Sequence, residues 1–452
     1  MASTLPTLVT GRERTRLDRA LALFADVRAG EGAGALLLAA NVFCLLTFYS
    51  VLKIVREALI LSEGGAEIKS YAAAAQTLLL CALVPAYALV AARVNRIKLN
   101  CGVTLFFASH LLIFYVLGMA GFRVGIAFFL WIGIFNLVVI AQFWSFANDL
   151  YDTEQGKRLF PVVGIGASLG AVIGAAATAL SFGGVGAYRL MLIAAAGLLL
   201  PVGLTVWANV RDRRARRSTA RRTEDQPLAR TGGFRLIFTQ RYLLLIACLI
   251  VLVNVVNTLG EFLMGRLIAE NAVAAVAAGT AGGLSVRDLI GAMSGYVQAS
   301  VNLLGFLIQA FLVSRVFKWI GIRGALFILP IIALGSYSMI ALLPILAMVR
   351  IAKVVENSTD YSIQNTARHA LFLPTSREAK YNAKQAIDAF FWRLGDLLQA
   401  GIVFTGVSLG LNVRAYAAIN LVLVAGWLAI VVALAAEHKT LVSTDLNTEA
   451  AA

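Results

Sequence analysis

The sequence predicts an all-α, polytopic membrane protein whose twelve transmembrane helices form two parallel six-helix bundles. The first observation behind this prediction is composition: 60% of the 452 residues are hydrophobic, 14% are charged, and the mean hydropathy is +0.82. Soluble domains carry about 25% charged residues. The second observation is a series of long apolar runs, and the third is a similarity between the two halves of the chain. Together they exclude a soluble enzyme.

Each predicted span is an apolar run long enough for a helix to cross about 30 Å of hydrocarbon, which takes roughly 20 residues. The boundary between the ninth and tenth spans is the least well marked, because only Ser336, Tyr337 and Ser338 interrupt that apolar run. In chain order the spans are 34–61, 71–93, 101–121, 124–149, 159–182, 189–209, 241–266, 291–314, 322–340, 341–366, 384–409 and 415–436.

These spans divide the chain into five parts. Residues 1–33 carry five Arg and lack the apolar core of a signal peptide, so we expect this segment to be retained. Within it, residues 17–27 predict an interfacial helix with Leu17, Leu21 and Phe24 on one face. The parts are a cytoplasmic N-terminal segment (1–33), a first six-helix bundle (34–209), a basic cytoplasmic linker (210–240), a second bundle (241–436) and a cytoplasmic tail (437–452).

The basic residues indicate the orientation. If the N-terminus is cytoplasmic, 28 of the 39 Lys and Arg residues lie in cytoplasmic segments and 6 lie on the opposite side. This asymmetry follows the positive-inside rule, with both termini in the cytoplasm. The formal charge of +15 is therefore explained as a topology signal, and it gives no reason to expect a nucleic-acid partner.

An internal duplication links the two halves. Glu57 at the end of the first span precedes Lys157 by 100 residues, and Glu261 in the seventh span precedes Lys380 by 119. Most of the difference can be placed in the Ala- and Gly-rich segment 271–290, which we expect to be a loop. Parallel halves of six spans are the plan of major-facilitator transporters, in which two bundles rock about a binding site near the middle of the membrane.

Several charged side chains lie inside the predicted spans. An ion at a helix centre costs at least about 2.5–3.5 kcal/mol, so these groups should face the bundle interior. Lys53, Arg56 and Glu57 share one face of their helix because they lie three and four residues apart. We expect five cations to bind an anionic substrate and the acids to pair with them. The alternative is a set of closed ion pairs, such as Lys353 with Glu356 or Arg393 with Asp396. The predicted substrate-binding cations are Lys53, Arg56, Arg350, Lys353 and Arg393, and the predicted coupling or ion-pair acids are Glu57, Glu261, Glu356 and Asp388.

Other motifs carry less weight. Gly166, Gly170 and Gly174 recur every four residues, a spacing that allows close helix packing. The chain has three His and no HExxH, GxSxG or GxxxxGK[ST] motif, so we expect neither catalysis nor a bound cofactor or metal.

The order and spacing of several motifs resemble the bacterial and plastid-type ATP/ADP translocases. The similar positions run from about residue 35 to 430. They include Tyr49, Lys53, Arg56, Glu57, Phe143, Trp144, Asn148, Lys157, Arg158, Tyr242, Asn254, Asn257, Glu261, Tyr361, Ser362, Pro374, Lys380, Asp388 and Arg393. The resemblance implies a twelve-span nucleotide exchanger, distantly related to major-facilitator transporters, in a bacterial inner membrane. It also implies polar cavity residues at Asn148, Asn254 and Asn257, and charged gate loops at Lys157, Arg158 and Lys380.

The chain departs from that family after the Tyr-Ser pair. Where those exchangers usually carry an acidic-Pro-Thr-Lys-Glu stretch, this chain reads Gln364-Asn-Thr-Ala-Arg368-His369. We therefore expect the substrate to be a nucleotide or another phosphorylated organic anion, carried by a monomer in the bilayer. Two alternatives stay open: a major-facilitator porter for another solute, driven by protons through Glu57 or Glu261, and a transport-inactive membrane scaffold or sensor.

Overall fold

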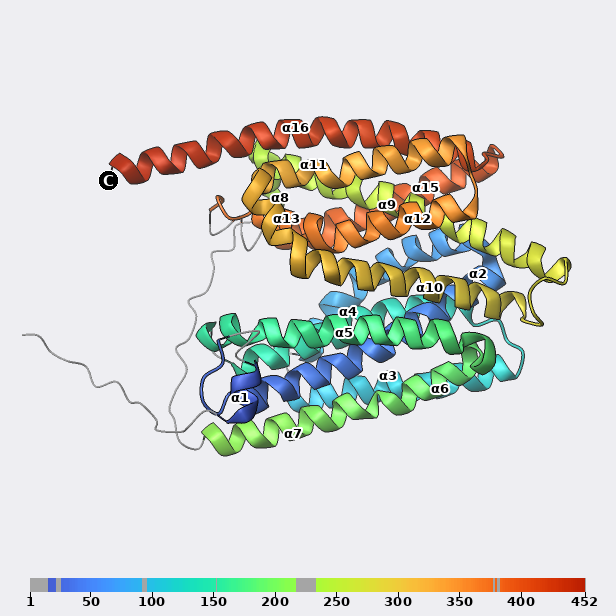
Figure 1. The fold of residues 1–452 in the computed structure, drawn as a ribbon, viewed down its shortest axis with the longest axis horizontal. Helices are drawn as coiled ribbons and strands as arrows, with labels where there is room; N and C mark the ends of the chain where they lie inside the picture. The colour runs from blue at the N-terminus through green and yellow to red at the C-terminus, as the bar shows by residue number, and fades with distance from the viewer. Residues whose placement is uncertain are drawn as a thin grey trace, which may run out of the picture.

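The computed structural model describes residues 15–21, 26–91, 96–151, 153–216, 233–376, 379 and 383–451. Within these residues the chain is helical and contains no strand. Figure 1 shows the long helices running roughly side by side in two groups, one for each half of the chain. The prediction of an all-α protein is confirmed.

The first half of the chain forms one group of helices. A turn at Leu198 separates two of them, and its backbone stays near the helical region. The helices are α1 (Arg16–Leu21), α2 (Gly32–Ala91), α3 (Arg96–Met119), α4 (Gly125–Leu150), α5 (Thr153–Val185), α6 (Ala187–Gly197) and α7 (Leu199–Arg216).

The second half forms the other group. Three short stretches, labelled η, are π-helical and hold an extra residue in a turn of the helix. The elements are α8 (Gly233–Thr239), α9 (Arg241–Ala277), α10 (Val286–Leu307), η1 (Ile308–Leu312), α11 (Val313–Leu342), α12 (Leu346–Thr359), η2 (Asp360–Gln364), α13 (Asn365–Ala370), α14 (Lys384–Ala386), η4 (Ile387–Phe391), α15 (Trp392–Ser408) and α16 (Val413–Ala451).

Two glycines break helices that would otherwise be too long for a membrane. The 60 residues of α2 would extend about 90 Å at 1.5 Å per residue. At Gly65 the backbone takes φ 75° and ψ −176°, a conformation open to glycine, and α2 divides there into a first and a second arm. Gly321 does the same in α11, with φ 66° and ψ 179°. Both breaks fall between predicted spans.

Among the described residues, eight helical stretches are long and apolar enough to cross a membrane. The prediction of a multi-pass membrane protein is thus confirmed, while the count of twelve crossings stays a prediction. Two of the eight stretches, Gly32–Leu83 and Val286–Leu342, contain the breaks at Gly65 and Gly321.

Helices α2 and α5 approach each other closely along a glycine stripe. A Cβ atom at Gly166, Gly170 or Gly174 would overlap main-chain oxygens of α2. The prediction that these glycines serve helix packing is confirmed.

Each half has a hydrophobic core of its own. The halves meet where α5 packs on α10 and where the second arm of α2 packs on α9 and α15. The second arm of α2 therefore contributes to the core of the second half, through residues such as Ala66 and Ala72.

Several segment boundaries differ from expectation. The loop expected over 271–290 is shorter, because alanine favours helix and α9 continues to Ala277, while Ser285 caps the start of α10 by accepting a hydrogen bond from Asp288 N–H. Of the helix expected over 17–27, α1 covers the residues up to Leu21 and residues 26 and 27 are not helical, while residues 22–25, Phe24 among them, lie outside the described residues.

The expected linker and tail contain helix. α7 extends to Arg216, α8 covers Gly233–Thr239, and α16 runs on to Ala451. The break between the ninth and tenth spans lies at 343–345 rather than after residue 340. Pro344 causes it, because proline disfavours helical backbone in the preceding residue, and Leu343 takes φ −129° and ψ 84°. The division into two bundle domains stays a prediction.

Candidate functional site

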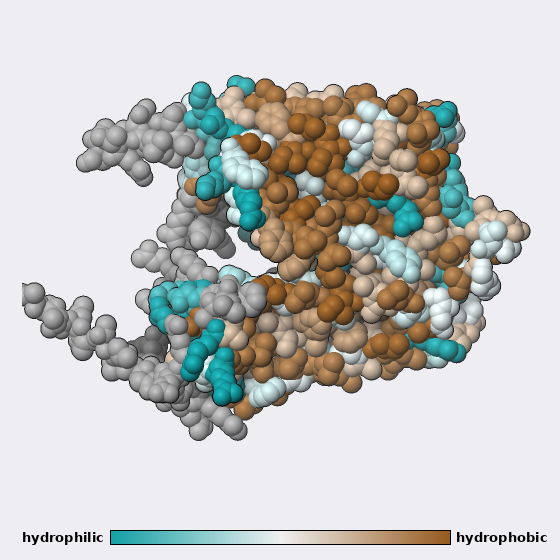
Figure 2. Space-filling view, in the orientation of Figure 1, coloured by the Kyte–Doolittle hydropathy of each residue, from teal (hydrophilic) through white to brown (hydrophobic). Residues whose placement is uncertain are grey.

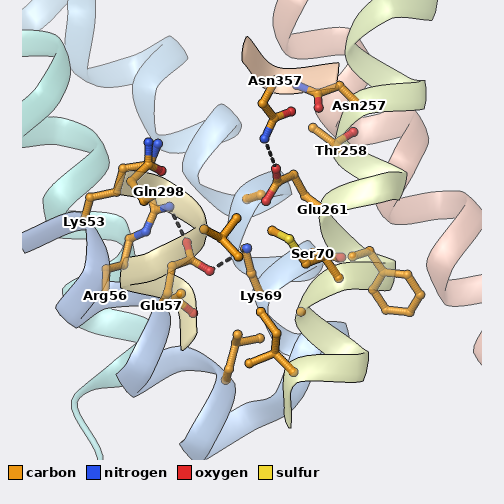
Figure 3. A pocket seen from close by; sticks show the side chains of 18 of the residues that line it. Lys53, Arg56, Glu57, Lys69, Ser70, Asn257, Thr258, Glu261, Gln298 and Asn357 are labelled. Carbon is orange, nitrogen blue, oxygen red and sulfur yellow. Dashed lines mark hydrogen bonds and ion pairs between the residues drawn. The ribbon is translucent and has the colours of Figure 1, made fainter. Parts of the chain in front are cut away.

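A cavity of about 240 Å³ lies between the two halves (Figure 3). Ligand sites typically measure about 300–1,000 Å³, so this cavity is slightly smaller than that range. Figure 2 shows the surface hollowed between the halves at the end where α5 begins and α13 lies. The charged residues of the cavity wall are Lys53, Arg56, Glu57, Lys69, Glu261 and Asp396.

Glu57 holds two of the cations. Arg56 donates a hydrogen bond to Glu57 Oε1, and Lys69 Nζ lies 2.6 Å from Glu57 Oε2. The three side chains are each about 15% exposed. The Arg56 guanidinium also lies 4.7 Å from the ring centroid of Phe129, within cation–π range. Lys69 reaches Glu57 because α2 breaks at Gly65, so the second arm returns past the end of the first.

Lys53 lies one turn before Arg56 on the same face of α2 and also lines the cavity. Among the described residues its ammonium group has no hydrogen-bond or ion-pair partner. An unpaired charge at a partly buried position favours the arrival of an anion.

The second half supplies mostly uncharged polar groups. Glu261 Oε1 accepts a hydrogen bond of 2.7 Å from Asn357 Nδ2. Asn257, Thr258 and Gln298 also line the cavity, and Figure 3 shows Glu261, Thr258 and Asn257 on the side opposite Lys53. One wall of the cavity is therefore rich in charge and the other in hydrogen-bonding groups.

Three of the five predicted substrate cations, Arg350, Lys353 and Arg393, lie outside the cavity wall. Lys353 is fully buried, and its ammonium group donates to Asn257 Oδ1 at 2.7 Å and Glu356 Oε2 at 3.2 Å. This is the closed ion pair that was the alternative for Lys353. Arg350 lies nearer the start of its helix than the predicted span 341–366 implies, because α12 begins at Leu346, after Pro344, and Arg350 is in its second turn.

Arg393 also forms the alternative ion pair. Its Nη1 lies 3.4 Å from Asp396 Oδ2, while Asn254 Nδ2 donates to Asp396 Oδ1 at 2.8 Å. Thr77, from the second arm of α2, adds a 3.4 Å hydrogen bond to Asp396. Asp396 thus reaches the cavity with its charge balanced by neighbours, and Asn254 holds it there.

Among the predicted gate residues, the side chain of Arg158 is described, and it lies near the start of α5. Arg158 makes two 2.9 Å contacts with the carboxylate of Glu31, and Arg28 lies 3.0 Å from Glu154. Burial alone would raise the pKa of Glu31, but the hydrogen bonds and positive charges of Arg158 and Arg28 lower it. These contacts fix the segment before α2 onto α5.

The remaining predicted site residues add little to the cavity. The predicted ion-pair acid Asp388 pairs with Lys384 at 3.0 Å, and Asn148, a predicted cavity residue, is exposed on α4. The side chain of Lys157 and the whole of Lys380 lie outside the described residues.

At the opposite end of the molecule the halves are joined by Arg287 at the start of α10. Its guanidinium lies 3.6 Å from Glu63, 3.4 Å from Ser62 Oγ and 5.1 Å from the ring centroid of Tyr188. Glu63 also accepts a 2.7 Å hydrogen bond from Gly125 N–H. These contacts close the end of the cavity that carries Gly65.

Some wall residues were missed by sequence reasoning. Lys69 was counted as a loop cation on the opposite side of the membrane from the termini, although Gly64-Gly65 before it marks a chain reversal. No feature of the sequence singled out Asn357 or Gln399 as a cavity residue. Gln399 donates a 3.1 Å hydrogen bond to Ser70 across the two halves.

Solved structures of membrane transporters share this fold. The nucleoside transporter NupG aligns with a TM-score of 0.60 at 13% identity, over 89% of this chain and 98% of that one. A bacterial homologue of the human lysosomal transporter Spinster, inward-facing and unoccupied, aligns at 0.55 and 15% identity, over 92% and 97%. A POT-family transporter bound to 5-aminolevulinic acid aligns at 0.57 and 12% identity, over 89% and 96%. At these identities the likeness shows the fold alone, and it confirms the major-facilitator-like prediction.

The sequence itself identifies the family. No curated protein matches the chain. A family model described as TLC ATP/ADP transporter, however, matches residues 126–438, which is more than half of the chain. The family and the fold agree that this is a multi-pass membrane transporter for a small solute and not an enzyme. The resemblance drawn from the motifs is thus confirmed, and the chain belongs to the TLC ATP/ADP transporter family.

Proposed function

We propose that this protein exchanges nucleotides, or related phosphorylated organic anions, by alternating access, and that the phosphate groups bind at Lys53, Arg56 and Lys69. The observation that carries the proposal is Lys53, a cavity cation without a hydrogen-bond or ion-pair partner among the described residues.

The charges around Glu57 support phosphate binding. Arg56 and Lys69 share one carboxylate, so one of their two positive charges is left without a balancing negative charge. A phosphate group brings up to two negative charges and several acceptor oxygens. It can engage Lys53 directly and compete with Glu57 for the other two cations, and together with the Glu57 carboxylate it can balance all three positive charges.

The opposite wall suits the rest of a nucleotide. The amides of Asn257 and Asn357 and the hydroxyl of Thr258 offer both donors and acceptors. Such groups match the ribose hydroxyls and base edges, which carry no charge.

The placement of contacts between the halves supports alternating access. Arg287 closes one end of the cavity, and the surface is hollowed at the other end. The same site can face the second side of the membrane if the halves rock and these contacts open.

Orientation and assembly form part of the proposal. The excess of basic residues in the segments between spans supports cytoplasmic termini in a bacterial inner membrane. The open end then faces the cytoplasm. The cavity wall is built within one chain, which supports transport by a monomer in the bilayer.

Counterflow in proteoliposomes tests the proposal. Vesicles preloaded with ADP should take up labelled ATP, and uptake should need the internal nucleotide. Lys53→Ala should weaken the apparent affinity about tenfold or more, because a hydrogen bond to a charged group contributes about 1.5–3 kcal/mol. Arg350→Ala, outside the cavity wall, is the matched control. No nucleotide flux at millimolar concentrations, or equal effects of both variants, would contradict the proposal.

The same vesicles separate the alternatives. A porter for another solute driven through Glu57 or Glu261 would show uptake that depends on a pH gradient and ignores nucleotide. A scaffold or sensor would show no flux and no response to Lys53→Ala.

A further inference from the structure

A second, smaller pocket lies inside the second half, beside the buried Lys353. Its volume is about 10 Å³, which is close to the space that one water molecule needs. Its polar lining comes from Asn257 of α9, Glu356 of α12, Asp360 of η2 and Trp427 of α16. Asn257 also lines the central cavity, so the two spaces share a wall.

The pocket has more negative than positive charge. Glu356 and Asp360 lie four residues apart across α12 and η2, and they are only 4% and 7% exposed. Lys353 lies 3.2 Å from Glu356, whereas the carboxyl group of Asp360 makes no hydrogen bond or ion pair with any described residue. One ammonium group therefore serves two buried carboxyl groups. Two carboxylates in one buried site are not both stable as anions.

Two unpaired polar atoms belong to residues of this pocket. Glu356 Oε1 and Trp427 Nε1 are buried and have no hydrogen-bond partner. Glu356 Oε1 accepts hydrogen bonds when the carboxyl group is ionised, and Trp427 Nε1 donates one. A water molecule, or a protonated carboxyl group with that water, can satisfy both. A metal ion would place its charge against the indole N–H, so this lining disfavours a metal.

The other groups around the pair leave its charge uncompensated. Glu261 of α9 lies 3.9 Å from Lys353 Nζ and adds a further negative charge. Tyr337 of α11 donates to Glu356 Oε2 at 3.1 Å or to Val256 O at 3.2 Å. Arg368 of α13 is the other cation near Asp360, but its guanidinium lies over the Trp392 ring and bonds to Asn365.

We propose that Glu356 and Asp360 bind one proton between them, with a water molecule in the pocket, and that this proton is linked to substrate binding through Lys353 and Glu261. The linkage rests on the proposed function, whereas the proton site does not. The link is short: Glu261 lines the cavity, and its carboxylate faces the ammonium group that neutralises Glu356.

The sign of the linkage follows from charge. An anion bound in the cavity adds negative potential near Lys353, which favours the protonated form of the pair. Because coupling is reciprocal, protonation must then favour anion binding by the same factor. Substrate affinity should fall as the pH rises, by at most tenfold per pH unit for one linked proton.

Infrared spectroscopy of the whole protein in lipid tests the proton site without any substrate. The wild type should show a protonated-carboxyl band at pH 7 that is absent in Glu356→Gln and Asp360→Asn. The band should persist in Asp388→Asn, which removes an exposed acid paired with Lys384. A wild type without the band at pH 7 would overturn the proposal.

A further variant covers the case in which the carboxyl substitutions prevent folding. Trp427→Phe keeps every charge and removes the unpaired indole N–H. It should shift the frequency of the band, and an unshifted band would remove the assignment to this pocket.

Calorimetric titration with ADP between pH 6 and 8 tests the linkage. Ionisation of the phosphate itself, with a pKa of about 6, affects all variants equally. In the pH range over which the protonated-carboxyl band disappears, the affinity of the wild type for ADP should fall with rising pH more steeply than that of Asp360→Asn. A parallel pH dependence in both proteins would overturn the linkage. A band without any nucleotide binding would support the proton site and contradict the proposed function.

Discussion

Glu57 should limit how tightly the empty cavity takes up an anion. Its carboxylate holds Arg56 and Lys69 until a substrate phosphate competes for them. The substitution Glu57→Gln keeps the shape of the side chain and removes the competing charge. We therefore expect nucleotide to bind more tightly in this variant, although an acidic residue of the proposed site has been lost.

The magnitude follows from the two contacts. Each charge-assisted hydrogen bond contributes about 1.5–3 kcal/mol, and the neutral amide retains part of it. If binding must break about one such contact, removing the charge tightens the dissociation constant about tenfold to a hundredfold. The free protein should melt at a lower temperature, because three cations then face one another in the cavity.

Two measurements check this prediction. Calorimetric titration with ADP gives the affinity, and counterflow in vesicles gives the exchange rate, which should fall because the nucleotide leaves slowly. Glu270→Gln is the matched control, because it breaks an exposed pair with Arg266 outside the cavity. Weaker binding in a folded Glu57→Gln protein would refute the reasoning and make Glu57 a direct substrate ligand.

Three further predictions concern other parts of the molecule. Arg287→Ala should destabilise the conformation closed at this end by about 1–2 kcal/mol, a five- to thirtyfold change in its population relative to the open conformation. Spin-label distances across that end should broaden, and unchanged distances would argue that Arg287 does not hold it closed. Gly170→Ala should destabilise the protein by about 1–3 kcal/mol through overlap with α2; Gly164→Ala, which has open space, should not, and equal melting temperatures would contradict the packing argument. Asp18 accepts hydrogen bonds from Gly30 and neighbouring groups; these outweigh the rise that burial alone would cause and lower its pKa to about 2. The stabilisation that the ionised Asp18 carboxylate contributes is present at neutral pH and is lost as the pH falls from about 4 to 2. Asp18→Ala should speed hydrogen exchange at residues 26–32 about fivefold at pH 7, since losing such a cap costs about 1 kcal/mol; unchanged exchange would count against this role.

Hydropathy correctly predicted an all-α, multi-pass membrane protein, because a helix in lipid must satisfy its own backbone groups whatever it packs against. The sequence also predicted that Lys53 and Arg56 share one helical face, since residues three or four apart lie on the same side of a helix. Both predictions rest on local geometry, which one sequence contains.

The sequence alone could not predict which cation pairs with which acid. Lys353 could equally face the cavity or Glu356, and only the packing of α9 against α12 decides between them. Lys69 reaches Glu57 through a reversal that hydropathy reads as a plain loop. Arg350 was misplaced because the effect of Pro344 on the preceding residue was not weighed against a continuous apolar run.

The second arm of α2 has a consequence for how the protein is made. Its Thr77 and Ser70 bond to Asp396 and Gln399, which are 319 and 329 residues further along the chain. During synthesis these polar groups enter the bilayer long before their partners exist. The first half expressed alone should therefore be prone to degradation, and co-expression of the second half as a separate chain should rescue it. Assembly of the two halves would then be a late, all-or-none checkpoint in biogenesis.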